Sequence, residues 1–325
     1  MPECLRIEKL CKKYATNNFG EPIKHGVHAV HDVSFTIGQN ESFGLIGESG
    51  CGKSTIGRLI LGLEKPTSGE IWMEGARISA LRGAEWKQQR KTAQIIFQDV
   101  DGSLNPRHKV SKLLAEPFRV HGISHEQYAP RIKEVMTQLN IGAELLNRYP
   151  SQMSGGQRQR VSLARSVALR PRFLVADEPA ASLDISIQAQ VLALLNKLRR
   201  EYGMSLLYIS HNLRIIRQMT ERVGVMYLGS FVEEGDTENL FTNPLHPYTQ
   251  ILLSSLPVSH PRDRTAQKQI IRGEITERGD NSAGCLFAER CPRCMPVCRI
   301  DAPQTRTISE NQKVACHLYT QEGAL

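Results

Sequence analysis

Long apolar runs are missing from this 325-residue sequence, and none approaches the length needed to span a bilayer. The first residues, MPECLRIEKLCKKY, lack the apolar segment of a secretory signal. We therefore expect a cytosolic protein, in which thiols stay reduced and disulfides are rare, so that any membrane role comes through a partner. Low-complexity tracts and internal repeats are also missing. With 40% hydrophobic and 23% charged residues, the composition is that of an ordinary globular protein with ample material for a core.

The sequence also has no block of five or six consecutive basic residues, although its formal net charge is +8. Lysines and arginines are instead scattered in short groups such as QQRKTAQ and NKLRREYG. A net charge of this sign fits nucleic acid, an anionic membrane surface or a phosphorylated ligand. It fits equally a solvated surface with a modest excess of cationic side chains, and the composition does not separate the two.

The order of the expected elements predicts a layered α/β fold. Short β-rich runs occupy the first 100 residues, and apolar residues recur with helical spacing between about 110 and 170. The apolar runs FLVAD (173–177) and SLLYIS (205–210) are typical of buried parallel strands, and a helical stripe lies between them. We therefore predict a parallel central sheet with an inserted helical segment. A polar linker, VSHPRDRTAQKQ (258–269), then leads to a short cysteine-rich region.

The segment GESGCGKST (47–55) matches the phosphate-loop pattern G-x-x-x-x-G-K-[ST]. Glycines let backbone N–H groups surround a phosphate, while Lys53 can reach the β- and γ-phosphates and the Ser54 hydroxyl can ligate Mg²⁺. A strand is expected directly before this loop and a helix directly after it, which adds the helix dipole. The residues expected to contact the nucleotide here are Gly47, Glu48, Ser49, Gly50, Cys51, Gly52, Lys53, Ser54 and Thr55.

Two further motifs narrow the chemistry. Asp177 and Glu178 end the strand FLVAD, where an aspartate can hold Mg²⁺ through its water shell and a glutamate can polarise the attacking water. Alone, such a pair is more often a cap or loop feature, but the upstream phosphate loop favours catalysis. The segment MSGGQRQR (153–160) precedes a helix expected to begin near Arg158, and its hydroxyl and free backbone amides form a second anion site. The chain that holds a γ-phosphate needs only one such anion site for it. The second anion site therefore indicates that the phosphate is bound between two molecules.

Taken in order, these motifs resemble those of an ABC transporter ATP-binding subunit. The phosphate loop is followed by Gln98 after AQIIF, by SGGQ, by FLVADE, by SLD (182–184) and by ISH (209–211). The segments SLNPRHKV (103–110), VMYLGSFVEEGDTENLF (225–241) and NPLHPYTQILLSSLP (243–257), with the cysteine-rich end, resemble the oligopeptide/dipeptide branch. The resemblance covers nearly the whole chain. It implies an α/β P-loop ATPase domain at 1–257 with a β-rich subdomain and a helical subdomain at about 100–170, and an extension at 258–325.

The resemblance also implies roles for single residues. Two such ATPases pair head to tail, and each ATP lies between the phosphate loop of one and the signature residues of the other. Those residues are Ser154, Gly155, Gly156 and Gln157. Tyr14 stacks on adenine, and Asp184 links the two sites across the pair.

In the same family pattern, the catalytic residues are Lys53, Glu178 and His211. Glu178 is the general base, and His211 holds the γ-phosphate and the attacking water. The Mg²⁺ ligands are Ser54, Gln98 and Asp177, and Gln98 also senses the γ-phosphate. Two departures are visible: Met153 replaces the usual leucine of the signature, a volume-conserving change, and Asn212 stands where this branch commonly has aspartate.

What the resemblance implies about function is ATP-powered import of di- or oligopeptides. The expected partners are a second, non-identical ATPase, two membrane-spanning permease subunits that dock near Gln98 and residues 103–118, and an extracytoplasmic substrate-binding protein. The chain is expected at the cytoplasmic face of the membrane, as a peripheral subunit. Nickel or a metal chelate is the alternative cargo. A soluble ABC ATPase of translation or DNA repair fits poorly, because those proteins generally carry two cassettes or a long coiled coil, so no nucleic-acid partner is expected.

Five of the eight cysteines gather near the end of the chain, four of them in CLFAERCPRCMPVC (285–298). The pair Cys291–Cys294 has zinc-like spacing, and a [4Fe–4S] cluster or a metal-free core fits as well. The resemblance favours an iron–sulfur cluster, since the branch has a similar pattern at Cys285, Cys291, Cys298 and Cys316, with Cys294 left over. ATP and Mg²⁺ are the other expected cofactors.

Overall fold

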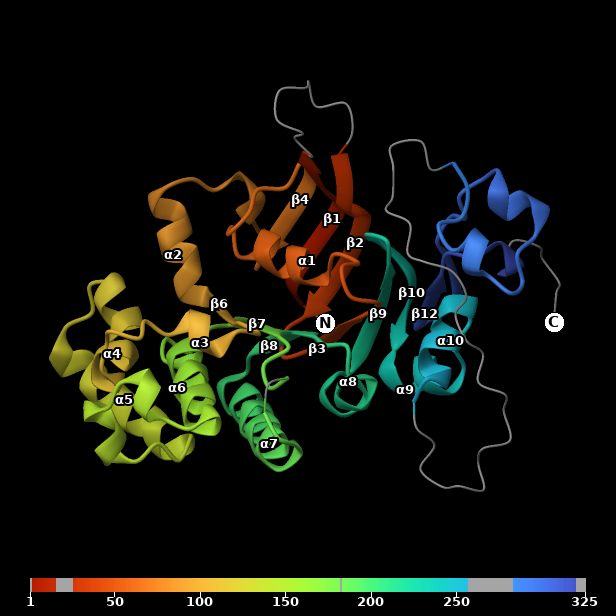
Figure 1. Cartoon of the computed structure of the whole chain (residues 1–325). Helices are drawn as coiled ribbons and strands as arrows, with labels where there is room; N and C mark the ends of the chain where they lie inside the picture. Colours follow the sequence, from red (N-terminus) through yellow and green to blue (C-terminus); the bar gives the residue numbers. More distant parts are fainter. Residues whose placement is uncertain (1, 16–25, 182, 257–282, 320–325) are drawn as a thin grey trace, which may run out of the picture.

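The computed structural model describes residues 2–15, 26–181, 183–256 and 283–319 (Figure 1). The linker expected at 258–269 lies outside the described residues. Within them, no helix is both long and apolar enough to cross a membrane.

An eight-stranded sheet forms the centre of the molecule, in the order β11-β12-β10-β9-β3-β8-β7-β6. Its parallel part consists of β3 (Ser42–Ile46), β6 (Ala93–Ile96), β7 (Phe173–Asp177), β8 (Ser205–Ile209) and β9 (Arg222–Tyr227). The antiparallel edge consists of β10 (Ser230–Asp236), β11 (Arg306–Ser309) and β12 (Gln312–Val314). The predicted parallel sheet is therefore confirmed.

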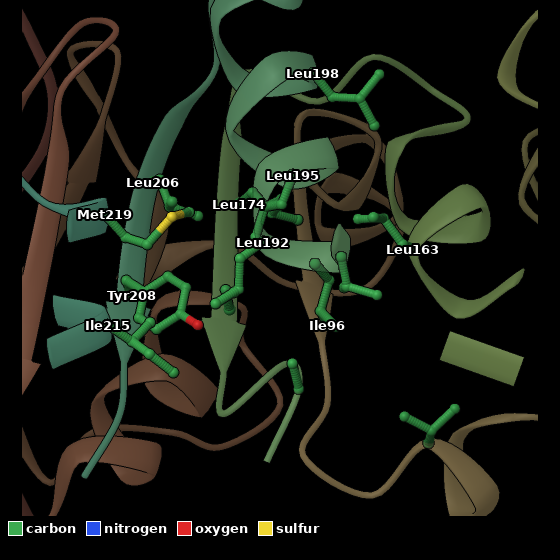
Figure 2. Packing of buried hydrophobic residues seen from close by; sticks show 14 of the residues in the cluster. Ile96, Leu163, Leu174, Leu192, Leu195, Leu198, Leu206, Tyr208, Ile215 and Met219 are labelled. Atoms are coloured by element: carbon green, nitrogen blue, oxygen red, sulfur yellow. The ribbon is translucent and has the colours of Figure 1, made fainter. Parts of the chain in front are cut away.

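The parallel strands are buried on both faces, which explains their continuous apolar runs. Successive side chains point to opposite faces, so Leu174 belongs to one core and Val175 to the other. Figure 2 shows Leu174 and Tyr208 packing among residues of the helices that cover one face. These helices are α6 (Gly155–Val167), α7 (Ile185–Tyr202) and α8 (Leu213–Met219).

The other face carries a four-stranded antiparallel sheet and α1 (Lys53–Ile60), as Figure 1 shows. The sheet has the order β2-β1-β4-β5. Its strands are β1 (Glu3–Ala15), β2 (Gly26–Gly38), β4 (Ser68–Met73) and β5 (Ala76–Arg77), followed by η1 (Ile78–Ala80) and α2 (Ala84–Thr92). Together they form the predicted β-rich part, although β1 and the full length of β2 exceed the short strands expected there.

The helical segment between β6 and β7 is confirmed. It consists of α3 (Val100–Ser103), α4 (Val110–Val120), α5 (His125–Gln138), η2 (Ala143–Asn147), η3 (Pro150–Gln152) and α6. The expected start of the last helix near Arg158 is wrong, because α6 begins at Gly155 with Ser154 as its N-cap. The hydroxyl of Ser154 accepts a bond from the N–H of Gln157, which lets the helix form through the two glycines.

The C-terminal elements continue the central sheet. After α9 (Thr237–Thr242) and α10 (Pro247–Ser254), the described chain resumes with η5 (Ala288–Arg290), η6 (Pro296–Arg299), the β11–β12 hairpin and η7 (His317–Tyr319). Strand β12 pairs with β10, with Val314 opposite Glu233. We use the name C-terminal region for residues 283–319, which lie beside β10 and α10 (Figure 1).

Candidate nucleotide site

The carboxyl ends of the parallel strands position the candidate site. Strand β3 ends directly before the phosphate loop, β7 ends at Asp177, and β8 ends two residues before His211. Asp177 is in register with Ile209 of the neighbouring strand. Parallel strands end at one edge of their sheet, and polar residues that follow them therefore meet there.

The phosphate loop depends on glycine at two points. Gly52, the N-cap of α1, has a φ of 101°, and a Cβ atom there would overlap the carbonyl oxygen of Ala29. Gly47 has a φ of 149°, and a Cβ atom would overlap the carbonyl oxygen of Met226. The backbone thus lies too close to its neighbours for any side chain at either position.

Lys53 is held inside this loop. Its side chain is buried, and Nζ donates hydrogen bonds to the carbonyl oxygens of Gly47 and Glu48, each at 2.9 Å. Nζ also lies 3.5 Å from Sγ of Cys51, whose thiol has a pKa raised by burial and is therefore neutral. The loop consequently carries a fixed positive charge, suited to an anionic phosphate.

Ser54 and Asp177 face each other across the strand ends. The Ser54 hydroxyl donates a 3.1 Å hydrogen bond to Oδ1 of Asp177. Burial raises the pKa of Asp177, and this bond partly offsets the rise. Hydroxyl and carboxylate oxygens are ligands that Mg²⁺ prefers, so these two side chains fit the predicted Mg²⁺.

Glu178 is clamped between two predicted site residues. Gln98 Nε2 donates to Oε2 of Glu178 at 2.9 Å, and His211 Nδ1 lies 2.6 Å from Oε1. The backbone of Glu178 is left-handed, with a φ of 47°, and its N–H donates to the carbonyl oxygen of Ile209. A non-glycine residue in this region is strained, and strain of this kind is common at functional sites.

The signature residues form a separate part of the site. Ser154 and Gln157 form a capping box at the start of α6, and Arg158 Nε pairs with Oδ1 of Asp101 at 2.6 Å. Asp101 lies in α3, three residues after Gln98, so this pair joins the signature helix to the segment that carries Gln98. In the described residues, no hydrogen bond or ion pair joins residues 154–157 to the phosphate loop.

Tyr14 and Asp184 lie at the margins of the site. Tyr14 is partly exposed in β1, and its hydroxyl donates to a carboxylate oxygen of Glu64. Burial raises the pKa of Tyr14, and a hydrogen bond with Thr55 places it beside the phosphate loop. Asp184 is exposed and caps α7, accepting a 3.0 Å hydrogen bond from the N–H of Ile187.

Known protein families and individual relatives match most of this chain. A family model described as "ABC transporter" matches residues 30–181, and one described as "Oligopeptide/dipeptide transporter, C-terminal region" matches residues 232–298. The putative oligopeptide transport ATP-binding protein YkfD of Bacillus subtilis is 42% identical over 299 residues, which is 91% of each chain. A putative peptide import ATP-binding protein of Brucella abortus is 41% identical over 317 residues, covering 97% of this chain and 94% of the relative.

This chain belongs to the ATP-binding subunits of ABC transporters, in the oligopeptide/dipeptide branch. Among solved structures, the ATP-binding cassette MJ0796, dimeric and bound to ADP and Pi, matches with a TM-score of 0.64 and 27% identity. The match covers 72% of this chain and 98% of that one. The chain is therefore an ATP-hydrolysing ABC subunit, and ATP and Mg²⁺ are the cofactors that this family implies.

The two residues that differ from the ABC pattern, Met153 and Asn212, lie in the core and at a helix N-cap. Met153 is buried in the core that lies under the helical segment. Asn212 is the N-cap of α8, and its Oδ1 accepts a 3.1 Å hydrogen bond from the N–H of Arg214. Asparagine and aspartate cap helices about equally well, so this function survives the exchange.

The predicted metal site of the cysteine-rich end is not supported. The pKa of Cys285 is raised to about 11, mainly by burial and in smaller part by Cys298, Cys316 and Cys291, so these four thiols lie near one another. All eight cysteines are free. Within the described part of the chain, no group of three or more His, Cys, Asp or Glu side chains is arranged to hold a metal ion. Burial raises the pKa of the Cys285, Cys291 and Cys316 thiols, and the iron–sulfur and zinc hypotheses gain no support from the structure.

The sequence motifs missed a cluster beside the phosphate loop, formed by Tyr227, Tyr248, Phe287 and Arg290. Tyr248 and Arg290 bind Glu48 of the phosphate loop directly. Nothing in their local sequence announces this role. Arg290 lies inside the cysteine-rich stretch, for which the sequence prediction concerned only the cysteines.

Proposed function

We propose that Glu178 is the general base of ATP hydrolysis in this chain. Its carboxylate accepts the proton of a water molecule as the water oxygen bonds to the γ-phosphorus, and the bond from that phosphorus to the β–γ bridging oxygen breaks. The products are ADP and inorganic phosphate. The observation that carries the proposal is the clamp on Glu178, in which Gln98 and His211 fix one carboxylate oxygen each.

The neighbouring residues have defined roles in this scheme. Lys53 neutralises charge on the β- and γ-phosphates, His211 orients the γ-phosphate and the water, and Tyr14 stacks on adenine. Ser54, Asp177 and Gln98 would hold Mg²⁺, which would supply charge neutralisation of the phosphates. The hydrogen bond between Ser54 and Asp177 supports this ligand set.

Turnover requires a second ATPase in this proposal. The residues Ser154, Gly155, Gly156 and Gln157 bind the γ-phosphate held by the partner, and Asp184 connects the two sites. Support comes from the start of α6 at Gly155, where the positive end of the helix dipole lies next to the exposed Ser154. The dimeric state of the similar cassette MJ0796 also supports it.

We further propose that this ATPase powers the import of di- or oligopeptides. Two permease subunits dock on the helical segment near residues 103–118, at the cytoplasmic face of the membrane, and a substrate-binding protein delivers the cargo. The names of the relatives, which are peptide and oligopeptide transport proteins, support peptide over nickel or a chelate. The proposed division of the chain is an ATPase domain at 1–257 and an extension at 258–325.

The test of the catalytic proposal is Glu178→Gln. Without the base, ATP turnover should fall by about 100-fold or more, while ATP affinity stays within about twofold of the wild type. Glu144→Gln, an exposed change in the helical segment, is the matched control and should keep wild-type turnover. Turnover by Glu178→Gln at the wild-type rate would remove Glu178 from this role.

The cargo has a separate test. The cognate binding protein, purified with its ligand and analysed by mass spectrometry, should release peptides. Nickel or a metal chelate in their place would overturn the peptide proposal and leave the ATPase proposal intact.

A further inference from the structure

The C-terminal region binds the phosphate loop through one arginine. Arg290 Nη1 donates to Oε2 of Glu48 and Nη2 donates to Oε1, each at 2.9 Å. Nη1 also donates to the hydroxyl of Tyr227 at 3.1 Å. The arginine side chain is 10% exposed and the glutamate 21%, so water screens this pair less than a surface pair. Two parallel charge-assisted bonds also fix the relative orientation of the two groups.

Arg290 is itself firmly placed. Phe287, three residues earlier, is 1% exposed and packs against both Tyr227 and Tyr248, at ring-centroid distances of 5.2 and 5.4 Å. The short helix η5 then turns the chain, with the N–H of Arg290 bonded to the carbonyl oxygen of Phe287 at 3.1 Å. Flexible surface ion pairs contribute little because ordering their side chains is costly. Here the buried phenyl ring has already ordered the segment that carries the arginine.

Glu48 is held at all three of its polar groups. Its carboxylate binds Arg290, its backbone N–H donates to the Tyr248 hydroxyl at 2.9 Å, and its carbonyl oxygen accepts from Lys53. The Tyr248 and Arg290 contacts come from the C-terminal side of the chain. A shift of Glu48 would therefore displace an acceptor of the phosphate-loop lysine together with the backbone that receives the phosphates.

We propose that Arg290 is a positioning residue for ATP, acting through Glu48 to keep the phosphate loop in its phosphate-receiving conformation. The C-terminal region is thereby part of the nucleotide site. Preorganising a loop strengthens binding because less order is lost when the ligand arrives. The inference rests on the proposed ATP hydrolysis, and it concerns ground-state binding rather than the chemical step.

The test compares full-length Arg290→Ala and Arg290→Lys with the wild type, using ATP with Mg²⁺. We expect Arg290→Ala to raise the Kd and KM for ATP about 10-fold while kcat stays within about twofold, the pattern of lost uniform binding. Arg290→Lys keeps the charge but not the bidentate fork, so its shift should be smaller. The matched control is Arg299→Ala, an exposed arginine of the same region, which should leave both constants unchanged.

A double-mutant cycle with Glu48→Ala tests whether Arg290 affects ATP binding through Glu48 or only stabilises the fold. If Arg290 acts through Glu48, the double variant should bind ATP no more weakly than the weaker single variant. A wild-type Kd and KM in Arg290→Ala, with only the Tm lowered, would overturn the inference, as would fully additive effects in the cycle. Should Arg290→Ala fail to fold, the same comparison is made with Arg290→Lys, and an unchanged Kd there overturns the inference.

The proposed function fails in a different way. If the wild-type chain, assembled with its partners, turns over no ATP, the ATPase proposal falls. If the wild type turns over ATP and the KM is unchanged in the Arg290 variants, only the positioning role of Arg290 is refuted.

Discussion

His246 is a buried base whose protonation should weaken the fold. Its side chain is 1% exposed, Nδ1 accepts a 3.0 Å hydrogen bond from the N–H of Tyr248 at the start of α10, and the backbone N–H of His246 donates to Oε2 of Glu233. Burial lowers the pKa of His246 to about 4. A proton would put an uncompensated charge in the core and remove the acceptor that caps the helix.

The size of the effect follows from the two pKa values. In the unfolded chain a histidine titrates near pH ~6.5, so the unfolded state takes up the proton first as the pH falls. Stability is therefore fully present above about pH 6.5 and is lost as the pH falls toward about 4. One pKa unit corresponds to ~1.4 kcal/mol, which gives a total loss of about 3 kcal/mol, of which about 2 kcal/mol should disappear between pH 7 and 5.

The neighbouring Glu233 titrates in the opposite sense. Burial raises the pKa of this carboxyl, so its contribution to stability grows as the pH falls. The comparison must therefore be made between two proteins that share Glu233. His246→Asn is suitable, because the Oδ1 atom of asparagine can cap α10 but does not titrate.

The assay is urea unfolding of the wild type and His246→Asn at pH 7, 6 and 5. The free energy of unfolding of the wild type should fall about 2 kcal/mol more than that of the variant over this range. Parallel pH dependence of the two proteins would refute the reasoning, since it would mean that His246 gains no proton on unfolding.

Two further predictions concern the phosphate loop and the C-terminal anchor. Gly52→Ala should weaken ATP binding at least about 10-fold, because its Cβ would overlap the carbonyl oxygen of Ala29 at a φ of 101°. Gly50→Ala has a φ of 81° but open space around the new methyl group, so titration with ATP should show a smaller loss. Phe287→Ala should lower the free energy of unfolding by about 3–5 kcal/mol in urea, against about 0.5 kcal/mol or less for the more exposed Val297→Ala. Equal losses of ATP affinity in the two glycine variants would contradict the steric argument. Equal losses of stability in the Phe287 and Val297 variants would contradict the packing argument.

Much of the site could be predicted because several of its residues follow or end short apolar strands. The phosphate loop comes after β3, Gln98 after β6, Asp177 ends β7 and His211 comes after β8. Buried parallel strands show themselves as continuous apolar runs, and their carboxyl ends share one edge. The sequence thus predicted that Lys53, Asp177 and His211 share one edge of the sheet, without giving any distance between them.

Some errors were local. The glycines of the signature have low helix propensity, which made a helix start near Arg158 the natural expectation. The capping box of Ser154 and Gln157 outweighs that cost, and α6 begins three residues earlier. The metal site suggested by the cysteine-rich stretch is a separate case: it is a hypothesis without structural support, since no group of three or more potential ligands lies together in the described part of the chain.

The sequence by itself determined the order of the motifs, the two-faced burial of the parallel strands and the helical segment between them, since periodicity and strand-end polarity are local properties. Only the tertiary structure decided that β12 joins the edge of β10, that Gln98 and His211 hold Glu178 from both sides, and that Arg290 binds Glu48 from 242 residues away. Contacts of this kind depend on shape and charge matching between distant segments, and no local pattern encodes which partner a side chain will meet.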